Sequence, residues 1–220
     1  MIHDADKKLL LLLPPKTGSQ TLRSLFISRY GNDIPRHFYS HISYNDITNI
    51  LTDINIDEYT IYGFYREPVA RFMSTFKYFQ RQINGSIKFR AQDGDDKQLK
   101  LVYKALYNDE DTTRDPASIT IDDILNAVEN QTLVGPVLDL FLPQTRYLTD
   151  KVTLLDFEDF ENNAKMLLGL FGMDNTRVIP KDNDTNSSEY LSDLTEAQIA
   201  KIKVLYAIDS AFFESHNITF

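Results

Sequence analysis

The sequence predicts an α/β fold in which helices flank a parallel β-sheet. Residues 9–13 are five consecutive leucines, a pattern typical of a strand that is buried on both faces. Residues 59–65 and 152–157 are two further runs with β-branched and aromatic residues, which also favour strands. A segment with helical spacing of apolar residues follows each run, and strands that alternate with helices indicate a parallel sheet.

The helices expected between these strands begin at recognisable signals. After the five leucines, a Pro-Pro pair and a polar turn precede Leu22, Leu25 and Phe26, which share one helical face. Pro68, a favoured first residue of a helix, opens a segment expected to remain helical to about Gln82. Further helices are expected over residues 43–51, 97–107, 120–130, 158–171 and 195–214.

Three of these helices begin at a capping signal. Ser43-Tyr44-Asn45-Asp46 predicts a capping box, Thr120-Ile121-Asp122-Asp123 caps the helix at 120–130, and Thr195-Glu196-Ala197-Gln198 opens the helix at 195–214.

Length and composition indicate one domain over residues 1–220. A chain of 220 residues with 42% hydrophobic and 25% charged residues can bury one substantial core. Between residues 84 and 118 the apolar periodicity is lost and acidic residues cluster. We expect this stretch, 84–118, to form an insertion at the rim of the sheet, where irregular functional segments commonly lie.

Charge and cysteine content narrow the possible partners. The net charge of −9 weighs against nucleic acid, because a generic polyanion surface needs clustered lysine and arginine residues. The chain has no cysteine, which excludes disulfides and thiolate metal sites, and its four histidines are scattered. The leucine run is far shorter than a membrane span. We therefore expect a cytoplasmic protein with no metal, no nucleic-acid partner and no membrane anchor.

The polar turn after the first strand is the first candidate site. It reads Pro15-Lys16-Thr17-Gly18-Ser19-Gln20-Thr21 and leads into the first helix. A loop at a helix N-terminus presents backbone N–H groups that can bind phosphate or sulfate. A Walker A loop has its lysine directly after its second glycine, whereas Lys16 here precedes Gly18. An ATP-dependent kinase is therefore disfavoured.

A second candidate site follows the strand at residues 59–65. Arg66 ends this strand, and Ser74 lies eight residues later on the next helix. Arginine offers a planar pair of donors and serine a hydroxyl donor, which suits a phosphate at the carboxyl edge of a parallel sheet. The alternative is that both are ordinary structural or solvated residues.

Together, the two candidate sites resemble the donor-binding motifs of sulfotransferases that use 3′-phosphoadenosine 5′-phosphosulfate (PAPS). Pro15-Lys16-Thr17-Gly18-Ser19 resembles the 5′-phosphosulfate loop, and Arg66-Glu67-Pro68 with Arg71 and Ser74 resembles the 3′-phosphate motif of the carbohydrate type. Tyr39-Ser40-His41-Ile42 is similar to the histidine segment of the uronyl and heparan 2-O-sulfotransferases, and Pro143-Gln144 and Asn186 resemble later family segments. The resemblance implies a P-loop-like strand-loop-helix sulfotransferase fold.

The resemblance also implies roles for individual residues. Lys16 would neutralise charge on the leaving oxygen, and His41 would act as the general base toward the acceptor. PAPS would be the co-substrate, without a metal, and the acceptor would be a hydroxyl of a glycan or small glycoside. The expected donor-binding residues are Lys16, Thr17, Gly18, Ser19, Gln20, Thr21, Arg66 and Ser74.

Two alternatives stay open from the residues themselves. His37 and His41 share a face of an extended segment, so spacing does not choose between them as the base. The family pattern favours His41, with an unperturbed pKa near 6.5. The chain could instead be a catalytically silent nucleotide-binding module that senses adenosine 3′,5′-bisphosphate. The presence of both Lys16 and His41 favours the enzyme.

Overall fold

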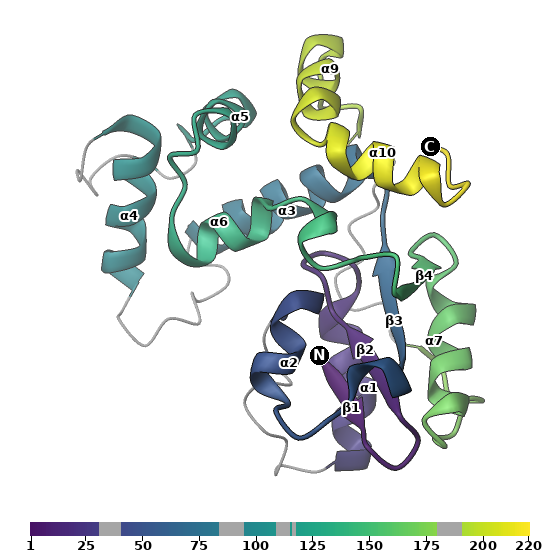
Figure 1. Ribbon diagram of the computed structural model, residues 1–220. Coiled ribbons are helices and arrows are strands. Elements are labelled where there is room, and N and C mark those ends of the chain that lie inside the picture. Colours follow the sequence, from purple (N-terminus) through teal and green to yellow (C-terminus); the bar gives the residue numbers. More distant parts are fainter. Residues whose placement is uncertain (31–40, 84–94, 109–114, 116–117, 180–190) are drawn as a thin grey trace. The chain divides into compact units, whose positions relative to one another are not determined.

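The computed structural model describes residues 1–30, 41–83, 95–108, 115, 118–179 and 191–220 (Figure 1). The chain divides into two compact units, each built from two segments. Unit 1 comprises residues 1–66 and 143–184, and unit 2 comprises residues 67–142 and 185–220. The single domain with an insertion at 84–118 stays a prediction, because much of that stretch lies outside the described residues.

Unit 1 is a mixed α/β structure built on a four-stranded sheet. The strands lie in the order β1 (Ile2–Asp4), β2 (Leu9–Leu12), β3 (Thr60–Tyr65) and β4 (Val152–Asp156). The pairs β2–β3 and β3–β4 are parallel, as predicted. The edge strand β1 pairs with β2 antiparallel and was not predicted, because three residues are too few to show a period.

Two helices pack on one face of this sheet. Helix α1 (Ser19–Tyr30) follows β2, and helix α7 (Phe160–Leu170) follows β4 (Figure 1). All four residues of β2 are buried, which confirms the expectation of a strand buried on both faces. The buried apolar cluster contains residues from all four strands, from α1 and α7, and from the segments that follow β2 and α7: Ile2, Leu9, Leu11, Leu13, Leu22, Leu25, Phe26, Phe64, Leu155, Ala164, Leu167, Leu168, Phe171 and Ile179.

The helix expected over residues 43–51 is shorter and less regular than predicted. It consists of a 3₁₀ turn, η3 (Tyr44–Asp46), and a single turn of α-helix, α2 (Ile47–Ile50). The Ser43 hydroxyl donates to the Asp46 carboxylate and makes no side-chain bond to a first-turn N–H group. The expected capping box is therefore not formed. Two further 3₁₀ turns lie among the described residues of unit 1, η4 (Ile56–Glu58) and η6 (Gln144–Arg146).

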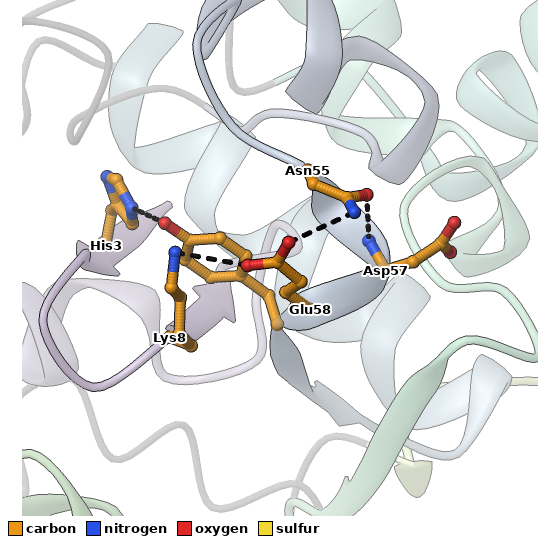
Figure 2. A network of polar contacts seen from close by, with 6 residues as sticks. His3, Lys8, Asn55, Asp57 and Glu58 are labelled. Carbon is orange, nitrogen blue, oxygen red and sulfur yellow. Dashed lines mark hydrogen bonds and ion pairs between the residues drawn. The ribbon is translucent and has the colours of Figure 1, made fainter.

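A network of polar contacts closes the end of the sheet at which β2 and β3 begin (Figure 2). Nε2 of His3 lies 3.1 Å from the Tyr59 hydroxyl, and Nζ of Lys8 lies 3.4 Å from a carboxylate oxygen of Glu58. Lys8 adopts a left-handed backbone (φ 54°), and its carbonyl accepts from the Thr60 N–H at 2.9 Å. The network therefore fastens the β1–β2 turn to the start of β3, at the opposite end of β2 from the polar loop.

Unit 2 is helical in its described residues. It contains α3 (Pro68–Ile83), α4 (Asp95–Tyr107), α5 (Ile121–Glu129), α6 (Gly135–Phe141), α9 (Glu196–Leu205) and α10 (Ala207–Ser215). The expected caps at Thr120 and Thr195 are both present as capping boxes. Its buried core is Val69, Phe72, Met73, Phe76, Phe79, Ile83, Val102, Tyr103, Ile119, Ile124, Leu125, Ala127, Leu133, Val137, Phe141, Ile202 and Tyr206.

The last helix was expected to be continuous over residues 195–214, and this was wrong. The chain leaves helical geometry at Tyr206 (φ −109°, ψ 24°), which separates α9 from α10. The Tyr206 hydroxyl donates to the Phe141 carbonyl at 2.6 Å, in the last turn of α6. Anchoring a fully buried tyrosine in this way satisfies its polar end, and the helix bends where the ring is held.

The core of unit 1 gives a stability prediction from two neighbouring residues of α7. Leu168 is fully buried, whereas Met166 is 40% exposed. We expect Leu168→Ala to lower the free energy of unfolding by about 2–5 kcal/mol, because it leaves a cavity. The control Met166→Ala should cost less than about 1 kcal/mol. Urea unfolding followed by circular dichroism measures both, and equal losses would contradict the packing described.

Candidate functional site

The loop between β2 and α1 is held in a tight turn by its own backbone. Lys16 and Gly18 both have left-handed backbones, with φ of 65° and 77°. The Thr17 hydroxyl donates to the Pro14 carbonyl at 2.9 Å, and the Leu22 N–H makes the first bond of α1 to the Gly18 carbonyl at 3.0 Å. First-turn N–H groups of a helix point away from intrahelical acceptors. The loop thus ends in a cluster of backbone donors with a helix dipole behind them.

Gly18 is required here for two separate reasons. Its positive φ is disfavoured for residues with a side chain. A Cβ atom added at Gly18 would lie 2.2 Å from Cε2 of Phe160, the first residue of α7. The Phe160 ring also contacts the rings of Phe64 and Phe157, with centroids 5.1 and 5.5 Å apart. The loop therefore rests directly on an aromatic cluster formed by the ends of β3 and β4.

Arg66 follows β3 and lies beside the same loop. Its side chain is buried, and Nη1 donates to the Lys16 carbonyl at 3.4 Å. The guanidinium carbon lies 4.4 Å from the centroid of the Phe157 ring, a cation–π arrangement. The Arg66 backbone is bonded on both sides to the side chain of Gln144. Two of the predicted anion-binding parts, Arg66 and the loop, are thus in contact.

His41 contacts the other end of the loop region. Its Nδ1 lies 2.6 Å from the carbonyl of Leu13, the residue just after β2. A carbonyl only accepts hydrogen bonds, so Nδ1 carries the proton in the neutral ring, and Nε2 holds the lone pair. Burial lowers the pKa of His41 from 6.5 to about 4; the bond to Leu13 opposes this, and the positive charges of Arg23 and Lys16 add to it.

An acidic group also stands at the carboxyl edge of the sheet. Tyr65 and Asp156 are paired residues at the ends of β3 and β4. Burial, followed by the charge of Asp156 and a hydrogen bond to it, raises the pKa of Tyr65 to about 12. Asp156 also accepts from the Glu158 N–H at 2.8 Å, which forms the turn into α7. Tyr65 is therefore a neutral hydrogen-bonding group at physiological pH.

The remainder of the arginine motif lies in unit 2 and starts helix α3. The carboxylate of Glu67 accepts from the Ala70 N–H at 2.5 Å and caps the helix, with Pro68 as its first residue. Arg71 is fully buried and donates to the Leu142 carbonyl at 2.7 Å and, more weakly, to the Leu140 carbonyl at 3.4 Å. Arg71 therefore has a structural part in unit 2, where it satisfies the end of α6.

The predicted site residues fall into three groups. Lys16, Thr17, Gly18, Ser19, Gln20, Thr21, His41 and Arg66 all belong to unit 1. Ser74 is a buried residue of α3 in unit 2, and its part in the site stays a prediction from the sequence. His37 and Asn186 lie outside the described residues.

Three residues beside the site were not singled out from the sequence. Gln144 was noted only for a family resemblance, and nothing in its pattern indicates that it bonds to Arg66. Arg23 occupies the polar side of α1, where a charged residue is normally solvated. Phe160 reads as an ordinary apolar residue of a helix. Each gains its significance from a contact between distant segments, which local spacing does not reveal.

The described part of the chain contains neither a candidate metal site nor a candidate membrane-spanning helix. Within these residues, no three histidine, cysteine, aspartate or glutamate side chains are grouped so that they could hold a metal ion. No helix among the described segments has the length and apolar character of a membrane span.

Comparison with known proteins assigns the chain to a group of enzymes. A model of the Sulfotransferase family matches residues 1–214. Among solved structures, the crystal structure of a sulfotransferase from Alicyclobacillus acidocaldarius matches with 10% sequence identity and a TM-score of 0.33. That alignment covers 91% of this chain and 95% of the other. No curated protein matches the chain.

The contact of Gly18 with Phe160 predicts a stability effect with a matched control. Gly135 also has a positive φ, of 60°, but nothing lies within 4 Å of the place that a Cβ would take. Gly135→Ala should therefore cost about 1 kcal/mol from backbone strain alone. Gly18→Ala should cost about 1–3 kcal/mol more, because the Phe160 ring must move. Thermal unfolding measures both, and equal costs would exclude the close approach.

The pKa of His41 predicts a pH dependence of stability. Between pH 6.5 and about 4 the unfolded chain binds a proton at His41 and the folded chain does not, so stability falls as the pH falls through this window. The loss attributable to His41 should reach about 2–4 kcal/mol. His41→Gln, whose amide can still donate to Leu13, should lack this part of the dependence. Urea unfolding at several pH values tests it.

Direct observation of the ring checks the same prediction independently. In an NMR titration the His41 ring signals should remain those of the neutral form down to about pH 5. A midpoint near 6.5, or an unchanged pH dependence in His41→Gln, would show that the ring is solvated and would contradict its burial.

Proposed function

The chain belongs to the sulfotransferase family, and we propose that it transfers a sulfuryl group from PAPS to a hydroxyl of a glycan or small glycoside. Family membership implies a transferase that moves a sulfuryl group to a hydroxyl-bearing acceptor. The observation that carries the finer proposal is the contact between Arg66 and the backbone of Lys16. It brings an arginine side chain next to a helix N-terminus, and this arrangement supports the proposal of a donor with two separate anionic groups.

The loop and Lys16 would hold the 5′-phosphosulfate, in the manner of a P-loop. Backbone N–H groups from Thr17 to Thr21 supply the donors, and the dipole of α1 favours the negative charge. The Lys16 ammonium would neutralise the charge that grows on the bridging oxygen as the sulfur–oxygen bond breaks. The left-handed backbone at Lys16 and Gly18 supports this role, because it turns successive N–H groups toward one concavity.

Arg66 would bind the 3′-phosphate. This group separates PAPS from ATP, which carries a hydroxyl at that position. A guanidinium can contact two phosphate oxygens at once, and stacking on Phe157 limits the orientations of its plane. Ser74, eight residues further along the motif, is expected from the sequence to contribute its hydroxyl.

His41 would remove the proton from the acceptor hydroxyl. The acceptor oxygen attacks sulfur, the bond from sulfur to the bridging phosphate oxygen breaks, and the proton passes to Nε2 of His41. Adenosine 3′,5′-bisphosphate then leaves. The Leu13 carbonyl supports this role, because its bond to Nδ1 directs the lone pair of Nε2 away from the backbone. The reaction is mainly positioning and charge stabilisation, as in phosphoryl transfer.

The low pKa of the free ring fits a base that becomes stronger when the donor arrives. Burial is the largest cause of the low pKa of His41, and the positive charges of Arg23, the N-terminus and Lys16 lower it further. An anion bound at the loop would oppose the effect of these charges, and a nearby negative charge raises a histidine pKa by about one to three pH units. Binding of the donor would therefore raise the pKa of His41 toward the range in which a general base is most effective.

The acidity of the chain supports a neutral or lightly charged acceptor. A net charge of −9 repels heavily sulfated polymers at a distance. Carbohydrate is the proposed acceptor class because the arginine and histidine motifs resemble those of carbohydrate sulfotransferases. The acidic stretch at 84–118 is the segment proposed to border the acceptor.

One assay with a matched control tests the proposed reaction. Transfer of sulfur-35 from PAPS to glycans and small glycosides should be detectable with the wild-type chain. His41→Ala should lower kcat by about 10² to 10⁴ and leave the affinity for adenosine 3′,5′-bisphosphate unchanged. His216→Ala is the control, because Nδ1 of His216 also bonds a backbone carbonyl, that of Phe212 at 2.8 Å.

Three outcomes of this assay separate the possible functions. Loss of turnover in His41→Ala alone supports the enzyme. Tight binding of adenosine 3′,5′-bisphosphate with no transfer to any acceptor supports the silent module. Near-normal turnover in His41→Ala means that another group is the base, and the assignment of the proton acceptor to His41 is then wrong.

A further inference from the structure

The side chain of Gln144 occupies an unusual position beside Arg66. It has no exposed surface. Its Oε1 accepts from the Arg66 N–H at 2.9 Å, and its Nε2 donates to the Arg66 carbonyl at 2.8 Å. Because a backbone N–H only donates and a carbonyl only accepts, these two bonds also determine which way the amide is oriented. A single side chain therefore bonds both polar groups of one distant residue.

These bonds take the place of a strand neighbour. The ladder between β3 and β4 ends at the pair Tyr65–Asp156, with one further bond from the Phe157 N–H to the Tyr65 carbonyl at 3.0 Å. Arg66 is the next residue, and it is buried. Buried backbone groups need partners, and Gln144 supplies a donor and an acceptor in one plane. Arg66 is therefore fixed at its backbone as firmly as a residue inside the sheet.

The Arg66 side chain is held by other contacts than the Arg66 backbone. Its guanidinium carbon lies 4.4 Å from the Phe157 ring centroid, and Nη1 donates to the Lys16 carbonyl. The direction in which a long side chain can reach depends on its own φ and ψ. Fixing the Arg66 backbone therefore also fixes where its guanidinium group contacts the loop at Lys16. A glutamate or a methionine at 144 would keep the volume and lose one or both of these bonds.

We propose that Gln144 is a positioning residue that holds Arg66 in register with the Lys16 loop and thereby sets the preference for nucleotides with a 3′-phosphate. This rests on the proposed function, in which Arg66 binds that phosphate. A bidentate contact depends on geometry, so a displaced fork loses the 3′-phosphate while the loop still holds the 5′-phosphate. Gln144 acts through Arg66 and touches no substrate itself.

Calorimetry with two nucleotides tests the proposal. The wild-type chain should bind adenosine 3′,5′-bisphosphate about 10- to 100-fold more tightly than 5′-AMP. Gln144→Met should reduce this ratio by about tenfold and change the affinity for 5′-AMP by less than about threefold. The control is Gln198→Met, which removes the bond from the Thr195 N–H to the Gln198 side chain in unit 2 and keeps the bond from the Gln198 N–H to the Thr195 hydroxyl. It should leave the ratio unchanged.

A second variant provides a signature that a purely structural role would not give. Gln144→Glu places an acceptor against the Arg66 carbonyl when the carboxylate is ionised. When protonated, the same group regains a donor and an acceptor. Burial raises the pKa of a carboxyl group. The nucleotide ratio of Gln144→Glu, relative to wild type at the same pH, should therefore be low at about pH 8 and recover toward wild type near about pH 5.5.

The outcomes distinguish this inference from the function on which it rests. Equal wild-type affinities for the two nucleotides would overturn the assignment of Arg66 and the inference with it. A wild-type preference that survives in Gln144→Met, or affinities for both nucleotides that fall together, would overturn the role of Gln144 alone. If Gln144→Met does not fold, the pH recovery of Gln144→Glu decides, and its absence counts against the proposal.

Discussion

The approach of the Phe160 ring to Gly18 is the constraint on which the rest of the candidate site depends. The loop after β2 can lie against α7 only because residue 18 has no side chain, and its left-handed φ would already disfavour one. The same ring packs on Phe64 and Phe157, and Phe157 stacks under the guanidinium of Arg66. One steric requirement therefore positions two features at once: the N-terminus of α1 and the fork of Arg66. Bulk at position 18 would separate them, since packed interiors leave no space for a ring to yield without moving its neighbours.

The charges of the site differ from those of the chain as a whole. The protein carries a net charge of −9, yet Lys16, Arg23 and Arg66 all belong to unit 1, in the loop after β2, in α1 and at the end of β3. Global charge governs long-range encounter, which salt screens within about 10 Å. Binding of an anion depends instead on a few partly buried donors at short range. An acidic protein can therefore bind a doubly anionic nucleotide at a local basic site while it repels polyanionic polymers from its general surface.

The sequence was most informative where the structure is local. Strands 59–65 and 152–157, the helix from Pro68 and the caps at Thr120 and Thr195 follow from period, proline position and capping chemistry, and they are confirmed. The break at Tyr206 was missed because a tertiary bond to Phe141 interrupts an unbroken helical pattern. The cap at Ser43 is not formed because the Asp46 N–H bonds to the Ser43 carbonyl in a 3₁₀ turn and not to the Ser43 hydroxyl. The motifs made Lys16 and Arg66 candidate residues, and the family pattern favoured His41 over His37, but the environments of these residues were not predictable. The unperturbed pKa near 6.5 assumed for His41 becomes about 4, because burial and nearby cations are products of the fold.

The lowered pKa of His41 connects donor binding to acid–base chemistry in the proposed reaction. Before the donor binds, the imidazole is neutral, so it is ready to accept a proton, but it is a weak base because a proton there would be buried beside Lys16 and Arg23. In the proposed reaction, the phosphosulfate would bring negative charge to the loop that carries Lys16. Binding of this anion would lower the free-energy cost of protonating the His41 ring. Proton transfer from the acceptor requires this protonation. Because the hydrogen bond to Leu13 fixes the tautomer in advance, the base needs no rearrangement when the donor arrives. In the proposed reaction, the loop that would hold the donor would therefore also make His41 a stronger base.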